Sequence, residues 1–214
     1  MFNLFGLPIK MFTIDPNDFD KTKLVGDVLD NYEISKTRNK WDDGSNIHHE
    51  NSDYGNDNFK KLDYSKLIPI YDKFVHQYLT QFKWKNNFNF KYTIDNYTCM
   101  GKGQFMKKHL HGSDFTAIHY LKYNKKHKST RFYNPNPSVE YFELVTPNLQ
   151  KNLDESHILN SWAFKSWYLD VEENHICFAP SSLLHGVPQQ QIDDLRITIV
   201  LNIYTTPLEE KENE

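Results

Sequence analysis

Three histidines in two distant segments have the types and the spacing to bind a metal ion. His109 and His111 lie two positions apart, and side chains at that interval on an extended strand point to the same face. A turn through Gly112 follows, with the carboxylate of Asp114 just behind it. Two imidazoles and a carboxylate at a strand end suit a divalent metal ion if a further ligand arrives from elsewhere. We expect His185 to supply it.

The ligand beside His109 and His185 is left open by the residues themselves. Side chains alternate along a strand, so His111 lies on the same face as His109. Asp114 would lie on the opposite face if the strand continued to it. Gly112 permits a reversal of the backbone that would bring Asp114 inward. A carboxylate would also offset the charge of the metal. The site is therefore either three histidines or two histidines and Asp114.

The alternation of the last expected strand separates a polar from an aliphatic face. An arginine that points into a β-roll needs an anion, because burial of an unpaired charge is costly. Tyr120 lies on an earlier expected strand, on the face that would point into the same interior as Arg196. The two side chains could therefore bind one carboxylate together. The alternative is that Arg196 pairs with Asp193 or Asp194 at the strand end. The polar face holds Arg196, Thr198, Val200 and Asn202, and the other face holds Ile197, Ile199, Leu201 and Ile203.

Two other histidine positions are assigned structural places. His48 and His49 lie in a polar stretch, Ser35–Asn58, which we interpret as a loop with a solvated histidine pair. His119 has the parity of the outward face of its strand, so we expect a buried histidine that serves packing.

Length and composition favour one domain over residues 1–214, large enough for a substantial core. A net charge of -3 and a pI near 6.4 argue against a nucleic-acid partner. No apolar run reaches membrane-spanning length. Cys99 and Cys177 lack zinc-type spacing, and so few cysteines favour a reduced, cytoplasmic setting. A monomer and a homodimer are equally compatible with the sequence.

The expected elements begin with a strand and two helices in the region of about 7–82. Asp20 is a candidate N-cap of the first helix, and the second spans about Ser65 to Phe82 with Pro69 in its first turn. Short alternating strands then form a core over about 88–206, interrupted by a surface insertion at Tyr141–Ser161. This order predicts an α+β fold, a double-stranded β-helix (jelly roll) of antiparallel sheets backed by the N-terminal helices. The expected strands cover 88–100, 104–111, 115–123, 130–133, 162–171, 175–179, 184–187 and 195–204.

Four motifs in order resemble those of the oxygenases that depend on 2-oxoglutarate and iron(II), in a branch common in phages and marine bacteria. The resemblance covers about Asn96 to Tyr204, and Arg196 follows His185 at the interval usual in that superfamily. The motifs are His109-Leu110-His111, AIHYL at 117–121, FAPSSLLHGVP at 178–188 and Arg196-Ile197-Thr198.

The resemblance implies that His109 and His185 bind Fe(II). It implies that Arg196 binds the distal carboxylate of 2-oxoglutarate, assisted by Thr198 and Tyr120. Such an enzyme consumes O2 and 2-oxoglutarate, releases succinate and CO2, and hydroxylates its substrate.

The sequence departs from the pattern at two positions. Gly112 stands where the branch has proline, and His111 stands where most of the superfamily has aspartate or glutamate. Because HxH occupies that slot in the branch, we expect His111 to be the third ligand and Asp114 to cap the turn.

The HYL segment resembles the equivalent strand of prolyl hydroxylases, which favours a protein or peptide substrate, with proline as one candidate residue. Ser35–Asn58 and Tyr141–Ser161 would then border a groove for an extended chain. A phage-encoded enzyme would act in the cytoplasm of the host cell. The alternative is a cupin-like metal-binding protein, or a virion-associated β-roll protein, without 2-oxoglutarate turnover.

Overall fold

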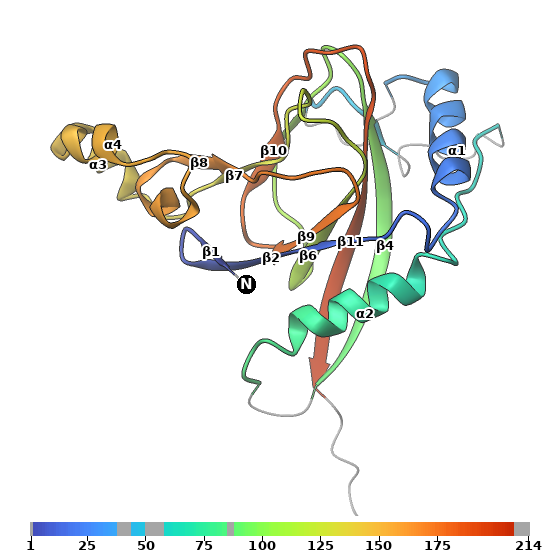
Figure 1. Cartoon of the computed structure of the whole chain (residues 1–214), viewed down its shortest axis with the longest axis horizontal. Helices are drawn as coiled ribbons and strands as arrows, with labels where there is room; N and C mark the ends of the chain where they lie inside the picture. The colour runs from blue at the N-terminus through green and yellow to red at the C-terminus, as the bar shows by residue number, and fades with distance from the viewer. Residues whose placement is uncertain (1, 38–43, 50–57, 85–87, 208–214) are drawn as a thin grey trace, which may run out of the picture.

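The computed structural model describes residues 2–37, 44–49, 58–84 and 88–207 and contains two antiparallel sheets (Figure 1). This arrangement confirms the predicted jelly roll. The large sheet runs in the order β1 (Phe2–Leu4), β2 (Leu7–Thr13), β9 (His175–Pro180), β6 (Phe115–Lys122), β11 (Arg196–Pro207), β4 (Phe88–Met100) and β3 (His48–His49). The small sheet runs in the order β5 (Met106–His109), β10 (His185–Val187), β7 (Arg131–Tyr133) and β8 (Ser166–Tyr168).

Two helices pack against the large sheet on its outer face (Figure 1). Helix α1 (Lys21–Ile34) begins after Asp20, whose side chain accepts a hydrogen bond from the Lys23 backbone amide at 3.0 Å, as predicted. Helix α2 (Ile68–Leu79) has proline in its first turn. Its buried side chains, Tyr71, Val75, Tyr78 and Leu79, lie in one core cluster with the aliphatic face of β11.

The alternation along β11 therefore sorts its side chains as predicted. Ile197, Ile199, Leu201 and Ile203 are all fully buried on the helix side. Arg196, Thr198 and Val200 point the other way, into the space between the sheets, where all three line one cavity. The strand thus joins a purely hydrophobic layer to a polar interior.

His119 lies on the helix side of β6 and is fully buried, which confirms its structural place. Its Nδ1 atom is hydrogen-bonded to the Tyr71 hydroxyl at 2.8 Å, and its Nε2 atom has no partner among the described residues. Burial lowers the pKa of His119 to about 3, so the ring is neutral.

The expectation of a solvated pair at His48 and His49 was wrong. The two residues form β3, which pairs with Thr98 and Cys99 of β4, and both side chains are buried. The His48 Nε2 atom lies 3.0 Å from the Tyr97 hydroxyl. A two-residue strand leaves no alternation in the sequence, so a polar stretch hid it. Residues 38–43 and 50–57 of the predicted loop lie outside the described residues.

The predicted insertion forms an arm that projects from the body of the molecule (Figure 1). It contains α3 (Val139–Val145), α4 (Pro147–Asn152) and the 3-10 helix η2 (Ile158–Ala163). The strand expected over 162–171 is only partly present, because η2 occupies its start and β8 covers three residues. Within the described part of the chain, no helix has the length and apolarity needed to span a membrane.

The contact between Tyr71 and His119 generates a stability prediction. Tyr71→Phe removes the partner of a buried ring nitrogen, which costs about 1–3 kcal/mol of unfolding free energy. Urea denaturation followed by circular dichroism measures it. Tyr92→Phe is the control, because its hydroxyl bonds to the Ile68 carbonyl at an exposed position and should cost less than about 1 kcal/mol. Equal losses in the two variants would contradict the buried role of the pair.

Candidate metal centre

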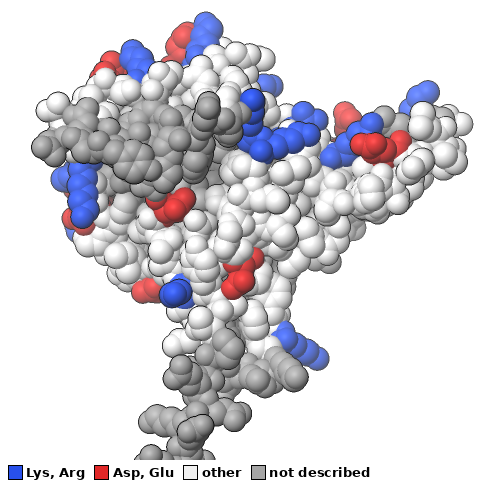
Figure 2. Space-filling view, turned by 180° about the vertical axis from the view of Figure 1, so that it is seen from behind, with Lys and Arg blue, Asp and Glu red and all other residues white. Residues whose placement is uncertain are grey.

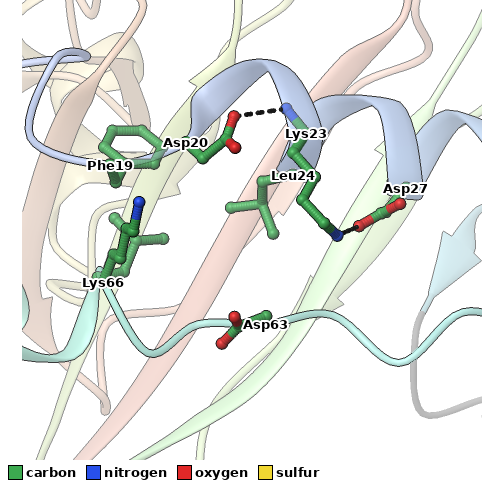
Figure 3. A pocket seen from close by; sticks show the side chains of 8 residues that line it. Phe19, Asp20, Lys23, Leu24, Asp27, Asp63 and Lys66 are labelled. Atoms are coloured by element: carbon green, nitrogen blue, oxygen red, sulfur yellow. Dashed lines mark hydrogen bonds and ion pairs between the residues drawn. The ribbon is translucent and has the colours of Figure 1, made fainter.

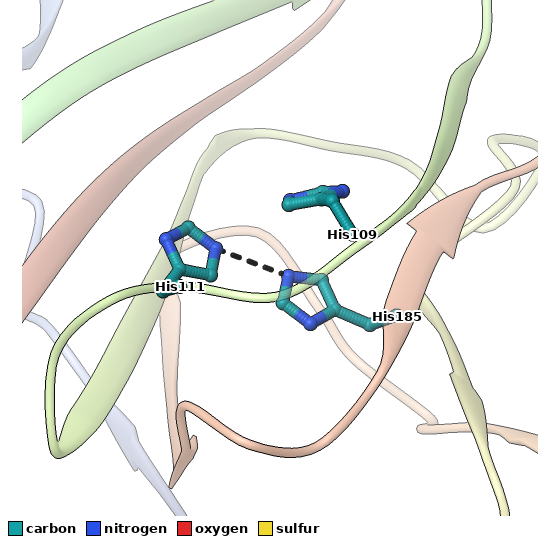
Figure 4. Close-up of side chains that lie close together, drawn as sticks. All are labelled: His109, His111 and His185. Carbon is teal, nitrogen blue, oxygen red and sulfur yellow. Dashed lines mark hydrogen bonds between the residues drawn. The ribbon is translucent and has the colours of Figure 1, made fainter. Parts of the chain in front are cut away.

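Strand pairing brings two of the three predicted histidines face to face. His109 ends β5, His185 begins β10, and the two residues are direct partners across the antiparallel pair. His111 follows in the loop after β5 and reaches the same point (Figure 4). One ligand nitrogen from each residue lies within 4.8 Å of the other two. Among the described residues, no other group of three His, Cys, Asp or Glu side chains comes as close.

Backbone carbonyls fix the orientation of two of the rings. His109 Nδ1 lies 3.0 Å from the Lys107 carbonyl oxygen, and His185 Nδ1 lies 2.9 Å from the carbonyl of Leu183. Each Nδ1–H therefore donates a hydrogen bond to the carbonyl, so Nε2 is the nitrogen of each ring that has the lone pair with which to bind a metal. The His111 and His185 Nε2 atoms are 3.3 Å apart, with nearly parallel rings.

Burial keeps the imidazoles in the form that a metal requires. It lowers the pKa of His185 to about 3 and that of His111 to about 4, with electrostatic repulsion from His109 as the next cause in both cases. At neutral pH both rings are uncharged, so their lone pairs are available without loss of a proton. Three imidazole nitrogens that converge on one point fit a divalent ion such as iron(II).

Asp114 has a different place in the structure. Its Oδ2 atom accepts hydrogen bonds from the Thr205 backbone amide at 2.7 Å and from the Thr205 hydroxyl at 2.8 Å. The turn is thereby tied to the end of β11, and the carboxylate is not part of the histidine group.

The histidines open into a narrow cavity between the two sheets, about 30 Å³ in volume, which also contains Arg196. No aspartate or glutamate is among the described residues that line it. They are His49, Asn96, Thr98, Met106, His109, His111, Ile118, Thr130, His185, Val187, Arg196, Thr198 and Val200.

Arg196 is a buried cation whose contacts are neutral. Only 1% of its surface is exposed. Nη1 donates to the Thr198 hydroxyl at 3.4 Å, Nη2 donates to the Thr130 hydroxyl at 3.2 Å, and the guanidinium lies 5.2 Å from the centre of the Tyr120 ring. Its Nε–H has no partner among the described residues. Burial lowers the pKa of the guanidinium, but the ordinary pKa of arginine is so high that the group stays charged.

The alternative of a strand-end ion pair for Arg196 was wrong. Asp193 lies 3.6 Å from the Lys102 ammonium, and Asp194 pairs with Lys122 and accepts a hydrogen bond from Asn124 at 2.7 Å. Both carboxylates belong to surface pairs beyond the strand end. Within the described parts of the chain, no ion pair to Arg196 is formed.

Tyr120 and Thr130 form the remaining wall around the guanidinium. The Tyr120 hydroxyl donates to the Thr130 hydroxyl at 3.0 Å, and the centre of its ring lies 5.2 Å from the Arg196 guanidinium. Burial raises the pKa of Tyr120 to about 12, which keeps it neutral. The role of Thr130 could not be predicted from the sequence, because one threonine at the start of a short strand carries no pattern.

Two further residues lie at the site although no role there was predicted for them. Asn202 shares a side-chain hydrogen bond with His111, which opposes the lowering of its pKa. Its period-two spacing from Arg196 was the available signal. His49 reaches the cavity through β3, where the polar context of the sequence gave no signal.

A second cavity, of about 200 Å³, lies beside the start of α1 (Figure 3). Three of its charged residues have structural partners: Lys23 pairs with Asp27, while Asp20 caps the helix through the Lys23 backbone amide. It has neither a histidine nor an arginine in its lining, so it offers no comparable site.

Comparison with known families finds one match that covers the site. Residues 97–202 match the family described as "Putative 2OG-Fe(II) oxygenase". This segment contains all three histidines and Arg196. No curated protein matches the chain significantly.

Solved structures share the fold at low sequence identity. A prolyl-4-hydroxylase from Pseudomonas putida has a TM-score of 0.55 and 10% identity, covering 94% of this chain and 95% of that one. A prolyl hydroxylase from Trichoplax adhaerens, in complex with a hypoxia inducible factor peptide fragment, has a TM-score of 0.52 and 13% identity. The match covers 92% of this chain and 83% of that one. SnoN, a non-heme alpha ketoglutarate dependent epimerase from nogalamycin biosynthesis, has a TM-score of 0.53 and 9% identity. The match covers 94% of this chain and 78% of that one.

The positions of His111 and Asp114 predict opposite results on metal binding. His111→Ala should weaken Fe(II) or Mn(II) binding by more than about 100-fold, because even residues that only support a ligand are worth about 10- to 100-fold. Asp114→Ala should leave the affinity nearly unchanged, since its carboxylate faces Thr205. Anaerobic isothermal titration calorimetry measures both. A large loss in Asp114→Ala with little effect of His111→Ala would reverse the assignment.

Proposed function

Because the chain belongs to the 2OG-Fe(II) oxygenase family, we propose that it hydroxylates a residue of a protein or peptide substrate, with His109, His111 and His185 as the iron ligands. When bound, iron(II) and 2-oxoglutarate supply the oxidising chemistry, in which O2 is consumed and succinate and CO2 are released. The chain itself must bind and orient these groups and keep water away from them.

The observation that carries the proposal is the buried guanidinium of Arg196 in the histidine cavity. A buried cation without a carboxylate is strongly unfavourable unless an anion joins it. His111 and His185 are neutral and no described residue of the cavity lining is an acid, so a bound divalent metal would add further positive charge. A doubly charged dicarboxylate such as 2-oxoglutarate offsets that charge, whereas a cupin-like protein that binds only a metal leaves Arg196 unexplained.

Arg196, Thr198 and Tyr120 are the residues that we assign to the co-substrate. The planar guanidinium can hold one carboxylate through two parallel hydrogen bonds, for which its free Nε–H is available. The Thr198 hydroxyl lies 2.7 Å from that of Thr98 and 3.4 Å from Arg196 Nη1, a position from which it can serve the same carboxylate. The Tyr120 ring lies 5.2 Å from the guanidinium and stabilises its charge through a cation–π contact.

Apolar side chains close the remainder of the cavity. Ile118, Met106, Val187 and Val200 line it between the histidines and Arg196, and three of the four are buried. Such a lining limits water at the site, so charged hydrogen bonds within it are stronger than at the surface.

The peptide substrate is the finer part of the proposal. It is supported by the HYL segment at 119–121 and by the two prolyl hydroxylases of the same fold. SnoN has the same fold and is an epimerase, so the fold by itself does not decide the reaction.

Mass spectrometry tests this part directly. A proteome treated with enzyme, Fe(II), ascorbate and 2-oxoglutarate should contain a polypeptide that gains the mass of one oxygen atom, with succinate formed in step. Omission of 2-oxoglutarate is the control. A change found only on a free metabolite, or a product without added oxygen, would contradict hydroxylation of a peptide.

Substitution of Arg196 separates co-substrate binding from metal binding. Arg196→Ala should raise the Kd for 2-oxoglutarate roughly tenfold or more, because a charged hydrogen bond is worth about 1.5–3 kcal/mol. Arg196→Lys keeps the charge but loses the planar pair of donors, so it should restore only part of the affinity. Calorimetry on the Mn(II)-loaded protein measures the Kd, and Mn(II) affinity should stay unchanged. Wild-type affinity for 2-oxoglutarate in Arg196→Ala would assign the arginine a purely structural role.

A further inference from the structure

A second groove lies on the outer surface of the small sheet, adjacent to the histidine cavity. Phe105, Met106, Lys107, Lys108, Arg131, Tyr133, Val187, Pro188 and Gln189 line it, and its volume is about 430 Å³. Met106 and Val187 also line the histidine cavity, so the groove and the cavity share a wall. Lys and Arg side chains gather between the body of the molecule and the projecting arm (Figure 2).

Cations and aromatic rings alternate across this surface. The Lys108 ammonium lies 3.9 Å from the centre of the Tyr133 ring, and the Arg131 guanidinium lies 5.4 Å from that ring and 5.6 Å from the ring of Tyr168. Arg131 Nε also donates to the Ser166 hydroxyl at 2.7 Å. These contacts hold the charged groups in place without neutralising them.

The positive charge of the groove is not balanced within the described parts of the chain. None of its lining residues is an aspartate or glutamate, and none of its three cations takes part in an ion pair formed there. Elsewhere the surface lysines Lys21, Lys60 and Lys122 are paired with carboxylates. The chain as a whole has a net charge of -3, so the positive charge of the groove is opposite in sign to the net charge of the protein.

We propose that this groove binds an acidic, extended segment of the protein substrate and so places a neighbouring residue at the histidine cavity. The proposal rests on the proposed function and names its substrate class. Three strands, β5, β10 and β7, contribute its lining, and at a spacing of about 4.8 Å they make the surface roughly 10 Å wide, which matches about three extended residues. Arg131 can hold an aspartate or glutamate side chain through paired hydrogen bonds, and Lys108 adds a second charge.

Other anionic ligands fit the groove less well. A single small anion would contact one of the three cations and would not explain why the other two line the same groove. A nucleic acid needs a larger positive field than three cations on a protein of net charge -3. An acidic polypeptide requires only a few charges in line.

Fluorescence anisotropy with labelled peptides tests the proposal. A peptide rich in Asp and Glu should bind the full chain, and its isosteric Asn/Gln counterpart should not. The double variant Lys108→Gln/Arg131→Gln should raise the Kd about five- to tenfold, since each exposed ion pair contributes modestly. Lys126→Gln is the matched control, because this exposed lysine lies outside the groove and should bind the peptide as the wild type does.

Three outcomes would overturn the proposal: no preference for the acidic peptide, equal binding by the double variant, or tighter binding of a single-stranded oligonucleotide. Binding of 2-oxoglutarate to the Mn(II)-loaded wild type is measured in parallel. If 2-oxoglutarate binds but the acidic peptide does not, the groove proposal fails and the proposed function stands. If 2-oxoglutarate does not bind, the proposed function itself fails.

Discussion

The burial of one positive charge governs the interior of this protein. Arg196 lies between the sheets with threonine hydroxyls and a tyrosine ring as its contacts, and it has no carboxylate partner in the described structure. Its position follows from the alternation of β11, which directs every second side chain to the hydrophobic layer beneath the helices. Rotation of Arg196 out of the interior would require a shift of register that buries polar groups against α2. The fold therefore preserves a cation that a bound dicarboxylate can neutralise.

The histidine centre depends on a different constraint, the pairing of β5 with β10. Cross-strand partnership brings His109 and His185 together, and backbone carbonyls set which nitrogen of each ring faces inward. His111 completes the group from the following loop. Three neutral ligands leave the charge of a bound metal uncompensated by protein. In the function that we propose, the dianionic co-substrate offsets the charge of both the metal and Arg196 and so couples the two ends of one cavity.

Much of this arrangement could be predicted from patterns that repeat along the chain. Period-two alternation predicted that Arg196 and Thr198 point between the two sheets and that the isoleucines of β11 point toward the helices. Apolar residues at helical spacing predicted α2. The parts that escaped prediction lack such repetition. Thr130 reaches Arg196 from a distant short strand, and β3 is two histidines long in a polar stretch. The helices of the arm pack little apolar surface, so their periodicity was too weak to separate them from a loop. Tertiary contacts decide these elements, and a single sequence does not contain them.

The most direct measurement of the central claim is the visible absorption of the protein with iron(II) and 2-oxoglutarate under anaerobic conditions. If the histidines bind the metal and Arg196 binds the co-substrate beside it, a metal-to-ligand charge-transfer band should appear only when both are added. It should be lost in His185→Ala and weakened at limiting 2-oxoglutarate in Arg196→Ala. A folded wild-type protein that binds iron(II) but gives no band with saturating 2-oxoglutarate would contradict the account.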